Sequence, residues 1–378
     1  MRGGTKFIVA NWKMNFSVFE SSLLVAKLSE LLPRNPKNSK TNPGSSRNSK
    51  NNSRANLSSD PPNPLFNSRE ISPPIKIILC PGFLALQTLA THLDRHVFSL
   101  GAQNCYWRDS GAFTGEVSAQ QLRGLAEFVI CGHSERRQIF REDETTVRFK
   151  VQAVLRNRMS PILCVGETFD QRERGDTVHI LQNQVASGLQ NVRESEISRV
   201  VLAYEPVWAI GSRHIPTPRD ISEATKIIRE TVARLFGEIP AAKIPVLYGG
   251  SVNPTDLRGI LSVSDLDGIL VGGDSLIAED FAKIIQLTRK IYTERSTVSA
   301  LALSPNSAKI PTSGPNSTHD LTENDSSASR DTASAPAKSP PDDFANQTLA
   351  SDPPTSSDPS SHFREIFTDS LTKTEEVS

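Results

Sequence analysis

Residues 200–211 read VVLAYEPVWAIG, and this stretch decides how the rest of the chain is interpreted. Its first four residues are apolar, which is typical of a strand buried on both faces of a parallel sheet. Proline cannot donate to a sheet ladder, so Pro206 predicts that the strand ends with Glu205 at its tip. Bulky Trp208 and flexible Gly211 follow, a composition that favours a lid. Glu205 is therefore a candidate base, and a buried carboxylate paired with an arginine is the alternative.

Strand-like and helix-like segments alternate on both sides of this stretch. The predicted strands span residues 6–10, 75–80, 97–103, 128–131, 161–165, 200–203, 244–247 and 268–271, and each precedes a predicted helix. Parallel strands need crossover helices, and eight such units close most simply into a (β/α)8 barrel, the TIM-barrel fold of about 250 residues. An open doubly wound sheet is the rival fold, but no Gly-x-Gly-x-x-Gly motif follows the first strand.

Two segments depart from this alternation. Residues 33–74 are rich in Asn, Ser, Pro, Lys and Arg, and residues 296–378 are rich in Ser, Pro, Thr and Asp. Segments of this kind bury too little apolar surface to offset the entropy of ordering. We therefore expect one barrel domain at residues 1–295, with a disordered insertion after its first helix and a disordered C-terminal tail.

The composition argues against several classes of partner. Lysine and arginine together number 42, as do aspartate and glutamate, so nothing favours nucleic acid or an anionic membrane. No apolar run is long enough to cross a bilayer, and the N-terminus lacks the apolar run of a secretory signal. The four cysteines have neither metal-ligand nor redox spacing (Cys80, Cys105, Cys131 and Cys164). This pattern predicts reduced core thiols in a cytoplasmic protein.

Polar and glycine residues gather where the predicted strands end, which is where this fold builds its active sites. They are Asn11, Lys13, His133, Glu205, Gly249-Gly250-Ser251 and Gly272-Gly273. Singly, each also fits a structural role as a surface charge, a helix cap or a turn. Together on one rim, they are harder to explain by structural roles alone.

The chemistry of this set points to one reaction type. Paired glycines beside helix N-termini leave backbone N–H groups open to a phosphate. Lys13 supplies a positive charge, and Ser134 is the predicted cap of a helix that would keep His133 neutral. A base, a neutral hydrogen-bond donor and a cation around a phosphate-anchored carbonyl compound specify proton abstraction next to the carbonyl.

Five motifs in this order resemble triosephosphate isomerase. They are NWKMN at 11–15, GHSERR at 132–137, YEPVWAIG at 204–211, YGGSV at 248–252 and LVGG at 270–273. The resemblance runs from about Thr5 to Ile291, apart from the insertion. It implies interconversion of dihydroxyacetone phosphate and D-glyceraldehyde 3-phosphate in glycolysis and gluconeogenesis, with neither cofactor nor metal.

The resemblance also implies a role for each matching residue. Glu205 matches the base that moves a proton between C1 and C2, His133 the neutral electrophile, and Lys13 the cation that favours the enediolate; this assignment is known for the family. Glu135 matches a carboxylate near the lysine, and Cys164 a buried cysteine beside the glutamate. The implied substrate contacts are Asn11, Lys13, Gly211, Ser251, Gly272 and Gly273. The segment between Gln103 and Glu116 matches the region that inserts into a partner subunit, which implies a homodimer.

Four positions depart from the family pattern. Arg213 and Pro216 lie where the lid is usually more flexible, which predicts a stiffer lid that still closes with altered kinetics. Asp274 replaces a common alanine, and we expect its carboxylate to face away from the phosphate. Phe16 stands where glycine is common, and the sequence offers no explanation for it.

Two other functions remain as alternatives at this stage. A Schiff-base aldolase needs a desolvated lysine inside the barrel, whereas the matching position of the sixth strand is Glu205. A non-catalytic scaffold would use the barrel to present the insertion and the tail. No expected catalytic residue is missing, which argues against the scaffold.

Overall fold

Eight parallel strands form a closed barrel in sequence order, and β8 pairs with β1 to complete it. The computed structural model describes residues 4–32, 73–209 and 215–302, with side chains to residue 298. The strands are β1 Lys6–Asn11, β2 Ile75–Cys80, β3 Phe98–Ala102, β4 Phe128–Cys131, β5 Ser160–Val165, β6 Val201–Tyr204, β7 Val246–Tyr248 and β8 Gly268–Val271. The predicted (β/α)8 barrel is confirmed and the doubly wound sheet is wrong. Nearly all of the insertion and most of the tail lie outside the described residues.

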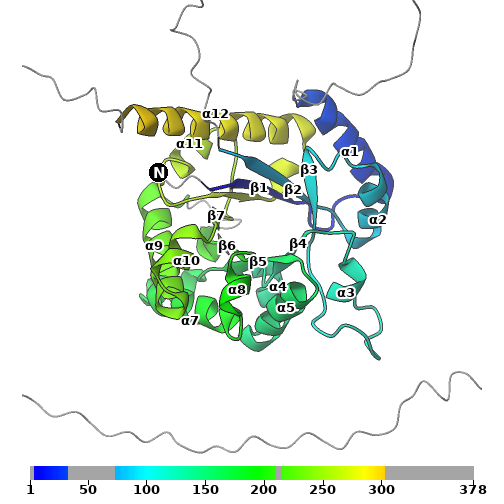
Figure 1. Cartoon of the computed structure of the whole chain (residues 1–378), viewed down its shortest axis with the longest axis horizontal. Coiled ribbons are helices and arrows are strands. Elements are labelled where there is room, and N and C mark those ends of the chain that lie inside the picture. The colour runs from blue at the N-terminus through cyan, green and yellow to red at the C-terminus, as the bar shows by residue number, and fades with distance from the viewer. Residues whose placement is uncertain (1–3, 33–72, 210–214, 303–378) are drawn as a thin grey trace, which may run out of the picture. The chain divides into compact units, whose positions relative to one another are not determined.

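Helices cover the outside of the barrel (Figure 1). They are α1 Val18–Leu31, α2 Phe83–His92, α3 Ala119–Leu122, α4 Ser134–Gln138, α5 Glu144–Arg156, α6 Phe169–Glu173, α7 Thr177–Leu189, α8 Glu194–Ile197, α9 Pro218–Phe236, α10 Glu238–Lys243, α11 Leu257–Ile260 and α12 Ala278–Ala302. Ser17 caps α1 in a capping box with Glu20, as its sequence position predicts. Among the described residues, no helix is both long and apolar enough to span a membrane.

Helix α12 continues past residue 295, where the barrel domain was expected to end. Tyr292 is buried, and its hydroxyl donates to the carbonyl of Leu266 at 3.3 Å. The hydroxyls of Ser296 and Thr297 donate to carbonyls four residues earlier, which satisfies these polar side chains within the helix. The segment expected to be a disordered tail from residue 296 therefore begins as the last turns of α12.

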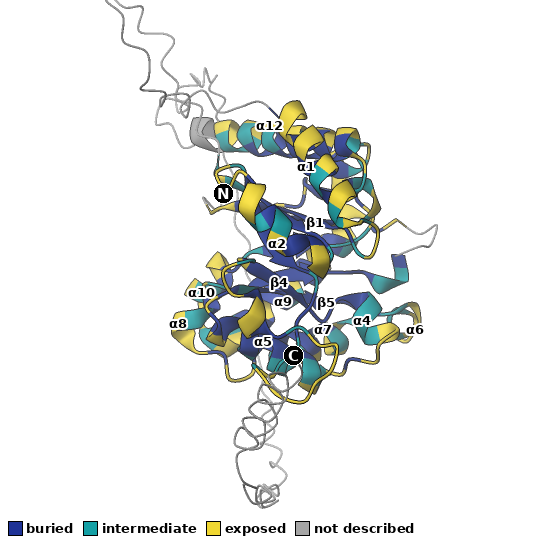
Figure 2. Cartoon of the chain, turned by 90° about the vertical axis from the view of Figure 1, so that its right-hand side faces the viewer, coloured by how far each residue is buried: buried dark blue, intermediate teal, exposed yellow. Residues whose placement is uncertain are grey.

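Alternating residues of the strands divide the core into two layers, because successive strand side chains point to opposite faces. Phe7 and Val9 of β1, for example, pack inside the barrel with Ile162 and Cys164 of β5. The other residues of each strand face the helices. Both faces of the strands are therefore buried (Figure 2), which explains why they read as continuous apolar runs.

A buried polar network lies at the end of the barrel where the strands begin. Asp267 lies just before β8, and its Oδ1 accepts from Nζ of Lys6 at 2.7 Å. Its Oδ2 accepts from Nη2 of Arg229 at 2.7 Å, and Nη1 of Arg229 donates to the carbonyls of Ala241 and Ile244 at 2.8 and 2.9 Å. The network ties β1 and β8 to α9 and α10.

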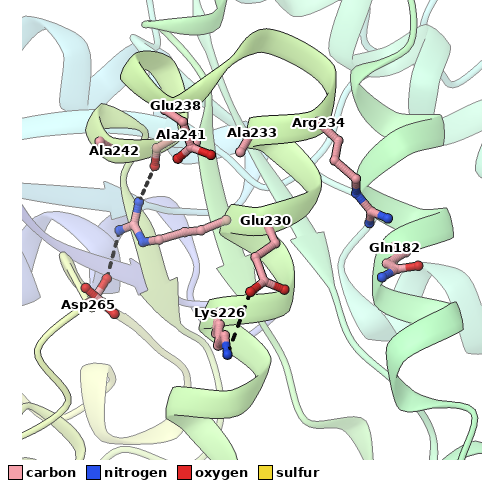
Figure 3. A pocket seen from close by; sticks show the side chains of 10 residues that line it. Gln182, Lys226, Glu230, Ala233, Arg234, Glu238, Ala241, Ala242 and Asp265 are labelled. Carbon is pink, nitrogen blue, oxygen red and sulfur yellow. Dashed lines mark hydrogen bonds and ion pairs between the residues drawn. The ribbon is translucent and has the colours of Figure 1, made fainter. Parts of the chain in front are cut away.

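A cavity of about 550 Å³ lies beside this network, between α7, α9 and α10 (Figure 3). Lys226 and Glu230 of α9 point toward one another in it, with 3.8 Å between Nζ and Oε1. None of the predicted site residues lines this cavity. It is therefore not the candidate active site.

Candidate active site

A second cavity, of about 250 Å³, opens where the strands end. Its lining includes eight of the residues predicted to gather at this rim. They come from the last residue of β1 and from the segments after β1, β4, β7 and β8 (Asn11, Lys13, His133, Gly249, Gly250, Ser251, Gly272 and Gly273). The barrel thus brings together residues that are up to 262 positions apart in the sequence, from Asn11 to Gly273. Glu205 follows β6 and reaches this group through His133.

Glu205 is 1% exposed, and its carboxylate is held against the start of α4. Its Oε2 accepts from the backbone N–H of Ser134 at 2.8 Å, and its Oε1 lies 3.4 Å from Nε2 of His133. In the part of the chain that the structure describes, the thiol of Cys164 is a further polar neighbour of this carboxylate. None of the described arginines pairs with Glu205, so the described residues do not support the alternative of a buried pair with an arginine.

Two glycines make the space in which Glu205 lies. A Cβ built on Gly166, after β5, would come within 1.7 Å of the carbonyl oxygen of Glu205. A Cβ on Gly249, after β7, would come within 2.9 Å of Cγ of Glu205. No role was predicted for Gly166. In the sequence it is a glycine directly after a buried strand, which also fits an ordinary turn.

Replacing Gly166 with alanine should displace Glu205 and lower activity at least tenfold. The new methyl group would overlap a backbone oxygen that cannot move without shifting β6, and overpacking of this kind costs about 1–3 kcal/mol. Turnover and urea unfolding measure the two effects. The matched control is Gly259→Ala, because a Cβ on Gly259 meets nothing within 4 Å. Unchanged turnover in the Gly166 variant would contradict this account.

His133 caps α4 with its own ring. Its Nδ1 accepts the backbone N–H of Glu135 at 3.2 Å. A ring nitrogen that accepts a hydrogen bond carries no proton, so this geometry corresponds to a neutral imidazole with its N–H on Nε2. Ser134 was predicted to be the N-cap of this helix but is instead its first helical residue. The cap is His133, because its ring accepts from the backbone N–H of Glu135 in the first turn of α4.

Lys13 extends across the cavity from the loop after β1. Its Nζ lies 2.5 Å from Oε1 of Glu135, and both side chains are partly exposed, so the pair adds little to stability. A Cβ on Gly272 would lie 3.6 Å from Cε of Lys13, which places the lysine beside the glycine segment after β8. The structure thus places the cation, the imidazole and the glycine segments around one cavity.

A sequence model described as triosephosphate isomerase matches residues 46–288. The chain belongs to the triosephosphate isomerase family. A triosephosphate isomerase of Caldanaerobacter subterraneus subsp. tengcongensis is 44% identical over 211 residues, which cover 56% of this chain and 85% of that protein. Another, from Chloroherpeton thalassium, is 36% identical over 282 residues, which cover 74% of this chain and 98% of that protein. The chain is therefore an isomerase of a triose phosphate, and the aldolase and scaffold alternatives are not supported.

In this member of the triosephosphate isomerase family, a polar network holds Trp208, at the start of the predicted lid. Glu167 accepts from Nε1 of Trp208 at 2.9 Å and from the hydroxyl of Tyr204 at 3.1 Å, and its burial raises the pKa of its carboxyl group. The guanidinium of Arg172 stacks 4.3 Å from the Trp208 ring. Neither Glu167 nor Arg172 was predicted to belong to the site. Gly211 and Arg213 lie outside the described residues, so their predicted roles stay predictions.

Other departures from the triosephosphate isomerase pattern are now visible. Asp274 is among the residues that line the cavity, so its expected orientation away from the phosphate is not supported. Burial, and then the charge of Asp280, raise the pKa of the Asp274 carboxyl group. Phe16 packs edge-on against Trp12, with ring centroids 5.6 Å apart, which gives this residue a packing role.

The cysteines behave as the sequence predicts. All four are free and buried. Cys164 lies inside the barrel, where burial and the nearby Glu205 raise the pKa of its thiol well above the usual range. The described residues hold no group of three His, Cys, Asp or Glu side chains placed to bind a metal.

Proposed function

We propose that the chain interconverts dihydroxyacetone phosphate and D-glyceraldehyde 3-phosphate through an enediolate, with Glu205 as the base. The observation that carries this proposal is the 3.4 Å approach of Glu205 Oε1 to Nε2 of His133, at the edge of a cavity that Lys13 also lines. A carboxylate and an imidazole N–H side by side suit a substrate that loses a proton next to a carbonyl group.

The glycine segments are the proposed phosphate site. Ser251, Gly272 and Gly273 line one side of the cavity, and Gly272 and Gly273 lead into a single 3₁₀ turn. Backbone N–H groups that no Cβ shields suit a phosphate, and this fold often binds one after its seventh and eighth strands. Gly211 of the lid is the proposed further contact, and Asn11 helps to order the site.

The proton transfer follows from the positions of the three side chains. Glu205 leaves the Ser134 amide, takes a proton from one carbon and returns it to the neighbouring carbon. The N–H of His133 donates to the carbonyl oxygen, and Lys13 stabilises the negative charge that develops on the enediolate. Glu135 holds the lysine, and buried Cys164 packs beside the base. Lid closure excludes water while the enediolate exists.

We further propose a cytoplasmic homodimer that acts in glycolysis and gluconeogenesis. The segment between Gln103 and Glu116 is the proposed contact, and Phe113 within it stacks on Tyr106 at 4.6 Å while staying partly exposed. Met14 and Leu84 are 98% and 87% exposed, which is unusual for large apolar side chains and fits an interface. Light scattering of the purified chain tests the dimer.

A coupled enzyme assay tests the proposed reaction. The purified chain is given D-glyceraldehyde 3-phosphate, and a glycerol-phosphate dehydrogenase with NADH detects dihydroxyacetone phosphate. We expect turnover that saturates with substrate and that persists in the presence of a metal chelator. No NADH oxidation above the background rate would contradict the proposal.

A further inference from the structure

The backbone of Lys13 adopts a conformation that few side chains tolerate. Its φ is +53°, in the left-handed region. Only four non-glycine residues in the described part of the chain have a positive φ, and Lys13 is the one that lines the small cavity. Left-handed backbone is unfavourable for a residue with a Cβ, so it persists only where neighbouring groups hold it.

Two side chains hold both backbone polar groups of Lys13. Its N–H donates to Oδ1 of Asn11 at 3.0 Å. Its carbonyl accepts from Nε2 of Gln103 at 2.7 Å, and the same nitrogen donates to the carbonyl of Cys80 at 2.9 Å. The Cys80 carbonyl also accepts from the backbone N–H of Trp12 at 3.1 Å. The Gln103 amide therefore joins the loop after β1 to the end of β2.

We propose that Gln103 is a positioning residue that acts through Lys13. The inference rests on the proposed role of Lys13 in binding the substrate. The resemblance placed Gln103 at the edge of the subunit contact, whereas its amide nitrogen is used within its own subunit. Without these two hydrogen bonds, the loop loses the restraint on the Lys13 carbonyl, and the ammonium group leaves the cavity and Glu135 more often.

Glutamine is the side chain that suits this position. Both N–H groups of its amide find carbonyl oxygens, so its donors are satisfied in a partly buried setting. Glutamate would bring a negative charge against two carbonyl oxygens. Methionine has similar length but no donor, and asparagine would withdraw the amide by one methylene group.

The test is a double-mutant cycle between Gln103→Met and Lys13→Met on the full chain. NMR titration with glycerol 3-phosphate, a non-reacting analogue, measures binding, and the coupled assay gives KM and kcat where activity remains. Loss of two neutral hydrogen bonds should raise KM and the dissociation constant roughly tenfold. In the Lys13→Met background, Gln103→Met should change the dissociation constant less than twofold, because the residue through which it acts is gone.

Matched variants separate positioning from general destabilisation. Gln152→Met also removes an amide-to-carbonyl bond, to Gln190 at 3.1 Å, but lies away from the cavity and should leave KM unchanged. If Gln103→Met does not fold, Gln103→Asn replaces it in the cycle.

Three results would overturn the inference while the wild-type chain remains active. They are a KM within twofold of wild type, an equal effect of Gln103→Met in both backgrounds, and a Gln103→Met variant that light scattering shows to have dissociated into subunits. An inactive wild-type chain would instead refute the proposed function itself.

Discussion

Replacing Glu205 with glutamine will lower kcat for triose phosphate isomerisation by roughly 10³-fold, within the range that a general base contributes. Glutamine occupies the same volume and its oxygen can still accept from the Ser134 amide, so the fold and the cavity should be unchanged. What it loses is the ability to take a proton from carbon. The coupled assay measures kcat, and thermal unfolding shows whether the variant is folded.

Two further variants make this prediction specific. Glu205→Asp keeps the charge but withdraws the carboxylate by about one methylene group, and a misplacement of about 1 Å costs roughly 10²-fold. Glu223→Gln changes an exposed carboxylate that pairs with Arg219 on α9, and it should leave kcat unchanged. A Glu205→Gln variant with kcat within tenfold of wild type would show that another group abstracts the proton.

The second large effect is expected at the other end of the barrel. Arg229→Met should lower the free energy of unfolding by about 3–5 kcal/mol, because it leaves a buried partner charge only partly compensated. Asp267 would keep Lys6 but lose the guanidinium, and the carbonyls of Ala241 and Ile244 would lose their donor. Urea unfolding at one fixed protein concentration measures the change.

The matched control for this prediction is Arg219→Met, which removes an exposed arginine from the same helix. Its salt bridge with Glu223 is solvated, so the unfolding midpoint should not move. Equal midpoints for the Arg229 and Arg219 variants would mean that the buried network does not stabilise the barrel.

The barrel could be predicted because strand-like and helix-like segments alternate along the sequence. Each strand is buried on both faces, so eight short apolar runs stand out between helical segments. Most of the candidate site could then be predicted as well, because this fold brings the ends of its strands to one rim. The residues predicted to gather at that rim, apart from Glu205, line one cavity there. Their roles in the reaction stay predictions that the experiments above test.

What the sequence did not reveal depends on close approach between distant segments. Gly166 reads as an ordinary turn until the carbonyl of Glu205 is seen beside it, and Gln103 reads as the edge of a subunit contact until its two carbonyl partners are known. The length of α12 was missed for a related reason, because Tyr292 is buried in the fold although the residues that follow it are polar. No local pattern encodes these contacts.

Solvent-hydrogen exchange tests the central claim most directly. Dihydroxyacetone phosphate is incubated with the enzyme in D₂O, and NMR follows deuterium at the carbon atoms of the recovered triose phosphates. A carboxylate that carries the proton between C1 and C2 exchanges it with solvent, so the account predicts deuterium at C2 of the D-glyceraldehyde 3-phosphate formed. It also predicts that this labelling almost disappears in Glu205→Gln. Rapid isomerisation without any deuterium, or labelling that Glu205→Gln leaves undiminished, would contradict it.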